Sequence, residues 1–170
     1  METLDLSAKS LGVASAVVIA SLIGVNGVLT ECNVRGNNLD SESAKKLAMI
    51  GTEKGIMLFG IKRGQKEANF RNQILGPAAP ADAILISSDL VTGSLTSLDL
   101  SNNELCGGTS WGATYTAEGI TAIADALRVT GVLTALDLSS NKLKDEGVSA
   151  VCEAIQSNKE TRSRVAQLLK

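Results

Sequence analysis

This sequence of 170 residues lacks the side chain that enzymes use most often as a general acid or base. It contains no histidine, so the usual general base, the common transition-metal ligand and the physiological pH switch are absent together. The GxxxxGK[ST] phosphate loop and the HExxH zinc motif do not occur, and a Ser-His-Asp set cannot form without histidine. We therefore expect no enzyme activity, no cofactor and no metal site, and we look for function among binding residues.

Three cysteines, Cys32, Cys106 and Cys152, stand far apart and show no CxxC or metal-ligand spacing. The apolar patterns around Cys32 and Cys152 place both at core positions, where a free thiol behaves as a small hydrophobe. Cys106 begins a loop, so it is either a packed thiol or an exposed and reactive one. Unpaired thiols suit a reducing compartment, and we expect a cytoplasmic protein.

Two segments hold residue types that often anchor a protein partner. Residues 106–116 contain Trp111 and Tyr115, the only tryptophan and tyrosine of the sequence, and such rings give a large contact area at a small entropy cost. Residues 62–79 carry four basic side chains and Phe70. The alternatives are that Trp111 fills a gap within the fold and that residues 62–79 form a solvated loop. The net charge of −2 argues against nucleic acid as the main partner.

The elements that must position these residues repeat along the chain. Residues 95–105 and 133–143 both read LxxLxLxxNxL. This pattern predicts a strand whose leucines enter a core, followed by a turn in which the asparagine pairs backbone groups. Weaker copies begin near residues 1, 29 and 56. The longer steps between the later copies leave room for the two segments at 62–79 and 106–116.

Between these strands the apolar period becomes helical. Two stripes have the i, i+3, i+4, i+7 spacing of an amphipathic helix: Ile120, Ile123, Ala124 and Leu127, and then Val148, Val151, Cys152 and Ile155. Residues 13–22, 43–48 and 82–90 occupy equivalent places. Each unit is therefore predicted as a strand, a turn, a helix and a return, which gives a parallel sheet with helices on one side.

With these motifs and the helices near Gly119 and Gly147, the chain resembles the leucine-rich repeat proteins, specifically the ribonuclease-inhibitor-like subclass. The resemblance implies an α/β solenoid arc of about five strand–helix repeats, with the parallel sheet on the concave face and the helices on the convex face. It implies one domain over residues 1–170, with repeats starting near 1, 29, 56, 95 and 133. We expect residues 158–170 to form a polar C-terminal cap.

The resemblance also implies a protein–protein interaction module without shared catalytic residues. Binding is expected on the concave face and on the two rim loops, 62–79 and 106–116. Asp5, Asp99 and Asp137 share one column of the concave face, because side chains alternate along a strand. These aspartates could bind a basic partner or could simply be solvated. The candidate protein-binding residues are Trp111, Tyr115, Asp99, Asp137, Arg35 and Phe70.

Residues 11–29 contain no charged side chain and approach the length of a membrane span. The glycines, serines and asparagine within the segment lower its hydrophobicity. We therefore expect a repeat helix covered on two sides, with membrane association as the alternative.

Two other functions remain open. The chain begins within a predicted strand, so it could be a fragment or a self-associating structural segment of a larger repeat protein, joined through its N-terminal edge. The repeat type is also similar to that of the Ran GTPase-activating proteins, which suggests a GTPase-regulating repeat protein, although no residue can be mapped onto that family.

Overall fold

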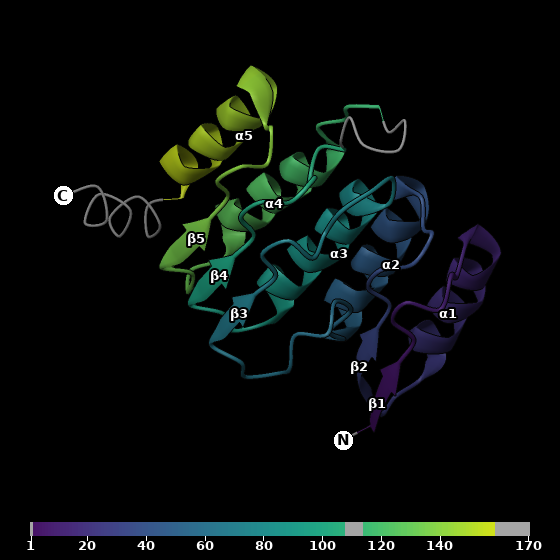
Figure 1. Ribbon diagram of the computed structural model, residues 1–170. Helices are drawn as coiled ribbons and strands as arrows, with labels where there is room; N and C mark the ends of the chain where they lie inside the picture. The colour runs from purple at the N-terminus through teal and green to yellow at the C-terminus, as the bar shows by residue number, and fades with distance from the viewer. Residues whose placement is uncertain (1, 108–113, 159–170) are drawn as a thin grey trace.

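The computed structural model describes residues 2–107 and 114–158, in which short strands alternate with helices (Figure 1). The elements in chain order are β1 (Glu2–Asp5), α1 (Val13–Val25), β2 (Leu29–Asn33), α2 (Ser41–Lys54), β3 (Glu67–Asn69), α3 (Ala79–Thr92), β4 (Ser97–Asp99), α4 (Glu118–Val129), β5 (Ala135–Asp137) and α5 (Lys144–Ser157).

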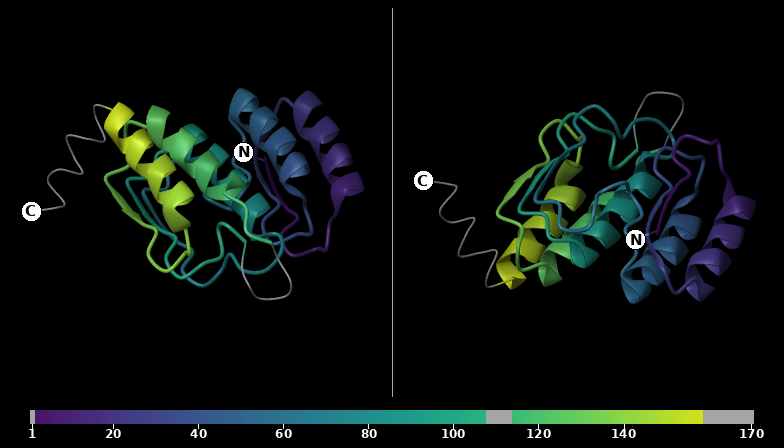
Figure 2. Two further views of the ribbon diagram at one scale, coloured as in Figure 1. Left: turned by 90° about the horizontal axis from the view of Figure 1, so that it is seen from above. Right: turned by 90° about the horizontal axis from the view of Figure 1, so that it is seen from below.

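The strands form two parallel sheets, with the orders β1-β2 and β3-β4-β5. The helices lie together in a layer on one side of the strands (Figure 2). A parallel strand must return to the same end of its sheet, and here a helix makes each return between paired strands. The predicted α/β class and the predicted parallel pairing are confirmed.

Buried asparagine side chains join the turns of successive units, as the LxxLxLxxNxL pattern predicts. The Nδ2 of Asn103 donates to the carbonyl oxygens of Phe70 and Leu100 at 2.9 and 2.8 Å, and its Oδ1 accepts from the N–H of Ile74 at 2.8 Å. Phe70 follows β3 and Leu100 follows the neighbouring strand β4. The Asn103 side chain therefore connects the turns that follow these two strands. Asn37 makes the corresponding bonds between the turns after β1 and β2.

The core is aliphatic and has α3 at its centre. Residues 79–90 of α3 are all buried, because α2 and α4 pack on either side (Figure 1). Gly119 lets α4 approach closely: a Cβ there would lie 2.4 Å from the carbonyl oxygen of Leu105 and 2.8 Å from the Cβ of Ala83. The apolar stripe predicted between residues 120 and 127 is buried.

The third unit differs from the sequence prediction. Residues 56–58 do run beside β2, where the N–H of Cys32 donates to the carbonyl oxygen of Met57 at 2.8 Å. The chain then turns inward, because the carboxylate of Asp89 accepts from the N–H groups of Leu58 and Phe59 at 2.6 and 2.9 Å. Leu58 is therefore buried in the core. The strand that pairs with β4 is β3, which lies inside the predicted rim loop 62–79.

Helix α1 is covered on one side, not on two as we expected. Ile19 and Ile23 are buried against the core, whereas Val17, Val18 and Val25 are 60 %, 69 % and 86 % exposed. An apolar sequence shows that a helix is hydrophobic but not how many helices surround it, and the main helical neighbour of α1 among the described elements is α2. No helix within residues 2–107 and 114–158 is long and apolar enough to cross a membrane.

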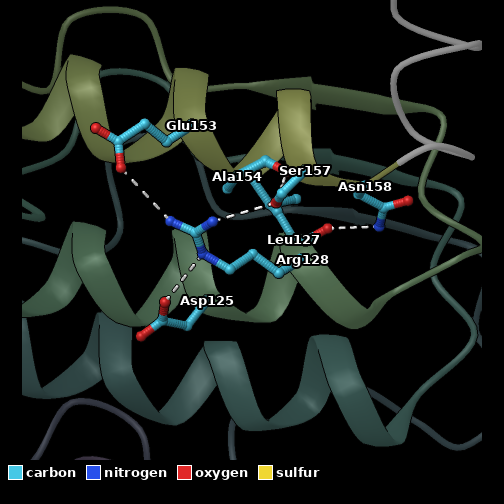
Figure 3. Close-up of polar contacts among 7 residues, drawn as sticks. All are labelled: Asp125, Leu127, Arg128, Glu153, Ala154, Ser157 and Asn158. Atoms are coloured by element: carbon cyan, nitrogen blue, oxygen red, sulfur yellow. Dashed lines mark hydrogen bonds and ion pairs between the residues drawn. The ribbon is translucent and has the colours of Figure 1, made fainter.

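Helix α5 packs on α4 through polar contacts that Figure 3 shows. Arg128 of α4 lies 3.8 Å from the carboxylate of Glu153. The Nδ2 of the buried Asn158 donates to the carbonyl oxygens of Leu127 and Thr130, at 2.7 and 2.9 Å, and so pairs the C-terminal end of α4. Apart from Asn158, the predicted cap at 158–170 lies outside the described residues.

The burial of the three cysteines agrees with the prediction only in part. Cys32 is buried as expected, and Cys106 is buried rather than exposed. Cys152, predicted in the core, is exposed, and Val148 beside it is 51 % exposed. The reason is that α5 packs mainly on α4 among the described helices, which leaves the outer part of its apolar stripe exposed.

Candidate functional site

The strand face is the side of the strands opposite the helices. Each strand ends there with an aspartate or an asparagine. Asp5 lies opposite Asn33 in one sheet, and Asn69, Asp99 and Asp137 lie in register in the other. We call these five residues the Asx column. The predicted aspartate column is therefore present, and Asn69 joins it because β3 lies at residues 67–69.

Each residue of the Asx column also shapes the backbone. Its side-chain Oδ1 accepts from the N–H two residues further along, at 2.8–3.2 Å in all five cases. Aspartate and asparagine favour this local turn, and it follows the strand in every unit. Sequence reasoning missed this role, although Asp-Leu-Ser occurs at all three aspartate positions. One oxygen of each side chain is used here, which leaves the second oxygen of each aspartate for a partner.

Asp99 and Asp137 are neighbouring carboxylates on β4 and β5. The Oγ of Ser101 donates to Asp99 at 2.6 Å, and this bond, with the Ser101 N–H and nearby Arg71, lowers the pKa of Asp99. Asp99 is therefore charged at neutral pH. Asp137 is exposed. Two adjacent acidic side chains on an open surface suit a basic group of a partner.

The structure brings together Arg35 and Phe70, which the sequence analysis had selected separately. The guanidinium of Arg35 lies 5.8 Å from the ring centre of Phe59 and 5.4 Å from that of Phe70. The two rings pack edge to face, with centres 5.1 Å apart. Arg35 also donates to the Oε1 of Gln73 at 3.0 Å. This cluster connects β2 with the segments on either side of β3.

Phe70 is only 8 % exposed, so the prediction of an aromatic anchor on the rim is wrong for this residue. Its ring fills the space beside Phe59, which residues 56–61 bring into the core. The basic side chains of the same segment behave as predicted and are exposed: Lys62, Arg63, Lys66 and Arg71. The half-buried Arg35 is also basic, whereas Asp99 and Asp137 are acidic, and Arg71 lies near enough to Asp99 to lower its pKa.

The loop at 106–116 is described only at its ends. Trp111 lies outside the described residues. Tyr115 is half-buried, its hydroxyl donates to the carbonyl oxygen of Leu143 at 2.9 Å, and the Nζ of Lys144 lies 3.9 Å from its ring centre. The contacts of Tyr115 therefore connect the end of the loop to the start of α5.

Cys106 lies at the other end of the loop. Burial raises the pKa of the Cys106 thiol to about 11, which makes the thiol a poor nucleophile.

Three buried carboxylates have structural partners. Asp82 accepts from the N–H of Gly36 at 3.2 Å, and Glu104 accepts from the N–H of Gly76 at 2.8 Å. Asp89 holds the inward turn described above. Burial raises the pKa of Asp82 to about 6 and that of Asp89 to about 7. Among the described residues, no group of three or more Cys, Asp or Glu side chains could hold a metal ion.

Comparison with known families supports the repeat assignment. A Leucine Rich Repeat model matches residues 94–113, which include β4, and a Leucine Rich repeat model matches residues 132–152, which include β5 and part of α5. The sequence matches no curated protein. The two matches support a leucine-rich repeat protein, and such repeats are generally protein-interaction modules.

Proposed function

We propose that this chain is a non-catalytic protein-binding module that uses its strand face. The observation that carries the proposal is the Asx column, which is in register within each of the two sheets and includes the neighbouring carboxylates Asp99 and Asp137. The helices pack on the opposite side (Figure 2), so the strand face is open to a partner.

The charges on this face define the chemistry of the partner. A basic segment of the partner would lie over Asp99 and Asp137, and an acidic segment would lie over Arg35 and the exposed basic side chains between residues 62 and 71. Complementary charges of this kind raise the association rate and select among partners more than they add affinity. Binding should therefore weaken as salt rises, because exposed charges are screened.

Three finer assignments belong to the same proposal. Helices of 12–14 residues between the strands support the ribonuclease-inhibitor-like subclass and a solenoid arc. Free thiols at Cys32, Cys106 and Cys152 support a cytoplasmic location. The loop around Trp111 and Tyr115 would supply a rim contact beside the strand face.

A capture experiment tests the proposal. The wild-type chain is immobilised and captured proteins are identified by mass spectrometry. The double variant Asp99→Asn, Asp137→Asn, which keeps the side-chain oxygens that accept in the turns, is compared with Glu53→Lys, which changes the net charge by the same amount. Glu53 is an exposed carboxylate on α2, on the helix side, so it controls for a simple change of charge. We expect the double variant to lose a partner that wild type and Glu53→Lys both retain. Equal capture by all three chains would contradict the strand face as the binding surface.

The rim contribution is tested separately with Trp111→Ala. We expect weaker capture of the same partner, because a tryptophan at an interface often contributes a large share of the binding energy. Unchanged capture by Trp111→Ala, together with loss in the Asp99 and Asp137 variant, would restrict the binding site to the strand face.

A further inference from the structure

One edge of β3 has no neighbouring strand within residues 2–107 and 114–158, because β3 is the first strand of the sheet β3-β4-β5. Helices α2 and α3 pack together, but β2 and β3 belong to different sheets (Figure 1). The sheet is interrupted because residues 56–58 run beside β2 and then turn inward at Asp89. An edge strand presents backbone donors and acceptors that can pair with another extended chain.

The backbone groups of Glu67 and Asn69 point to this free edge. The carbonyl oxygen of Lys66 accepts from β4, and the N–H of Phe70 donates to β4 at 2.8 Å. The backbone groups of successive residues alternate between the two edges of a strand, so those of Glu67 and Asn69 face away from β4. Both residues are exposed, which leaves their backbone within reach of a partner.

Two glutamine side chains bond the carbonyl oxygens of the free edge. The Nε2 of Gln65 donates to the carbonyl oxygen of Glu67 at 2.7 Å, and the Nε2 of Gln73 donates to that of Asn69 at 3.2 Å. These amides take the place that the backbone N–H groups of a neighbouring strand would have. Gln65 is half-buried and Gln73 is exposed, so an incoming strand can replace each amide by an equivalent hydrogen bond.

We propose that an extended, acidic segment of the protein partner adds to β3 as a further strand. This inference rests on the proposed function, since it specifies how the acidic segment of that partner binds. Residues 62–71 carry four basic side chains and one acidic side chain. Arg35 donates to the Oε1 of Gln73 at 3.0 Å, and this bond places its guanidinium beside the free edge. Main-chain bonds would hold the segment, and the cations would select acidic side chains.

A second copy of this chain fits the free edge less well. Pairing of β3 with β3 of a second copy would bring the basic residues 62–71 of both copies together, and like charges across a strand pair repel each other. A basic segment of another protein would meet the same repulsion. The charge around the edge therefore favours an acidic segment over both of these occupants.

An NMR titration of the full chain, labelled with ¹⁵N, tests the inference with a short synthetic peptide of alternating threonine and glutamate residues. We expect the amide proton signals of Glu67 and Asn69 to move downfield, because both gain an acceptor, while that of Ala68, which faces β4, changes much less. A strand of three residues offers few bonds, so we expect a dissociation constant on the order of 1 mM. The same peptide with lysine in place of glutamate should bind more weakly.

Glu67→Pro is compared with Glu67→Thr, because both variants remove the same charge. Proline lacks the N–H that faces the partner and leaves the bonds to β4 in place, whereas threonine keeps this N–H. We expect Glu67→Pro to raise the dissociation constant of the glutamate peptide at least about tenfold, and Glu67→Thr to bind at least as tightly as wild type. Where Glu67→Pro fails to fold, the shift pattern of the wild type decides.

Four results would overturn the inference. They are a wild type that does not bind the glutamate peptide, equal shifts at Ala68, Glu67 and Asn69, equal binding by the two Glu67 variants, and tighter binding of the lysine peptide. Each of these results is separate from the proposed function, because capture of a partner that depends on Asp99 and Asp137 would still support the strand face as the binding surface.

Discussion

Raising the pH from about 5 to about 8 should destabilise this protein, because Asp89 must lose its proton inside the core. The side chain is fully buried, and burial raises its pKa to about 7. In the unfolded chain the same carboxyl has a pKa near 3.9. Between these two values the folded state holds the proton more tightly, so the free energy of unfolding falls as the pH rises through this window.

The size of the effect follows from the pKa difference. The window between the unfolded pKa near 3.9 and the folded pKa of about 7 spans about three units, of which about two lie above pH 5. At about 1.4 kcal/mol per unit, the expected loss between about pH 5 and about pH 8 is therefore about 3 kcal/mol. Asp82, whose pKa is raised to about 6 by burial, acts in the same direction. Asp5 and Asp99 have lowered pKa values, and their contribution is lost only at lower pH, as the pH falls below the ordinary aspartate value near 3.9.

Urea unfolding of wild type and Asp89→Asn at several pH values measures this effect. The amide cannot ionise. At about pH 5 the protonated carboxyl of Asp89 still offers an oxygen to each of the N–H groups of Leu58 and Phe59, whereas the amide offers an oxygen to one and turns its NH2 donor toward the other. We expect Asp89→Asn to be less stable at about pH 5 by about 1–3 kcal/mol and to lose much less stability on going to about pH 8. A wild-type stability that is flat or rises over this range would refute the reasoning, as would an equal fall in the variant.

Three further perturbations have outcomes fixed by local geometry. Gly119→Ala should lower the free energy of unfolding by about 1–3 kcal/mol, because the added methyl would lie 2.4 Å from a backbone oxygen. Gly24→Ala should raise the free energy of unfolding by about 0.5–1 kcal/mol, because the added methyl meets nothing within 4 Å. Thermal unfolding that ranks the two variants in the opposite order would contradict this packing. Asn158→Ala should cost about 1–3 kcal/mol in chemical denaturation, because two carbonyl groups at the end of α4 lose their donor, and an unchanged midpoint would argue against that bond. Cys152 should react with a thiol reagent in the folded protein while Cys106 reacts only after unfolding, so similar labelling rates would show that Cys106 is accessible.

The two complete LxxLxLxxNxL motifs allowed the most reliable prediction. They place β4 and β5 at the expected residues and the helices after them in the expected order. The buried Asn103 does what the motif requires. This success has a physical cause, since a strand with alternating leucines and a turn asparagine leaves few other ways to bury its side chains and pair its backbone.

The third unit could not be read correctly because two segments compete for one strand position. Residues 56–61 are more apolar than β3, and they do pair beside β2, but Asp89 draws them into the core. A polar residue inside an apolar helix gives no sign in the sequence of the backbone groups that it binds. The sequence feature that could have located β3 was Asn69, because its side chain forms the same turn after the strand as the other members of the Asx column.

The candidate site was predicted in part. Asp99 and Asp137 lie on the strand face as expected, and Arg35 is half-buried against Phe59 and Phe70. The burial of Phe70 depends on its contact with Phe59 across a separation that no local pattern reports. The exposed side of α1 was missed for a similar reason, because an apolar period does not show how many neighbours a helix has.

Carboxyl footprinting of the chain, free and bound to its captured partner, tests the strand-face proposal most directly. The proposal predicts slower labelling of Asp99 and Asp137 in the complex, with no change at Glu53 and Asp125 on the helix side. Slower labelling at Glu53 and Asp125 with Asp99 and Asp137 unchanged would place the partner on the helices and contradict the proposal.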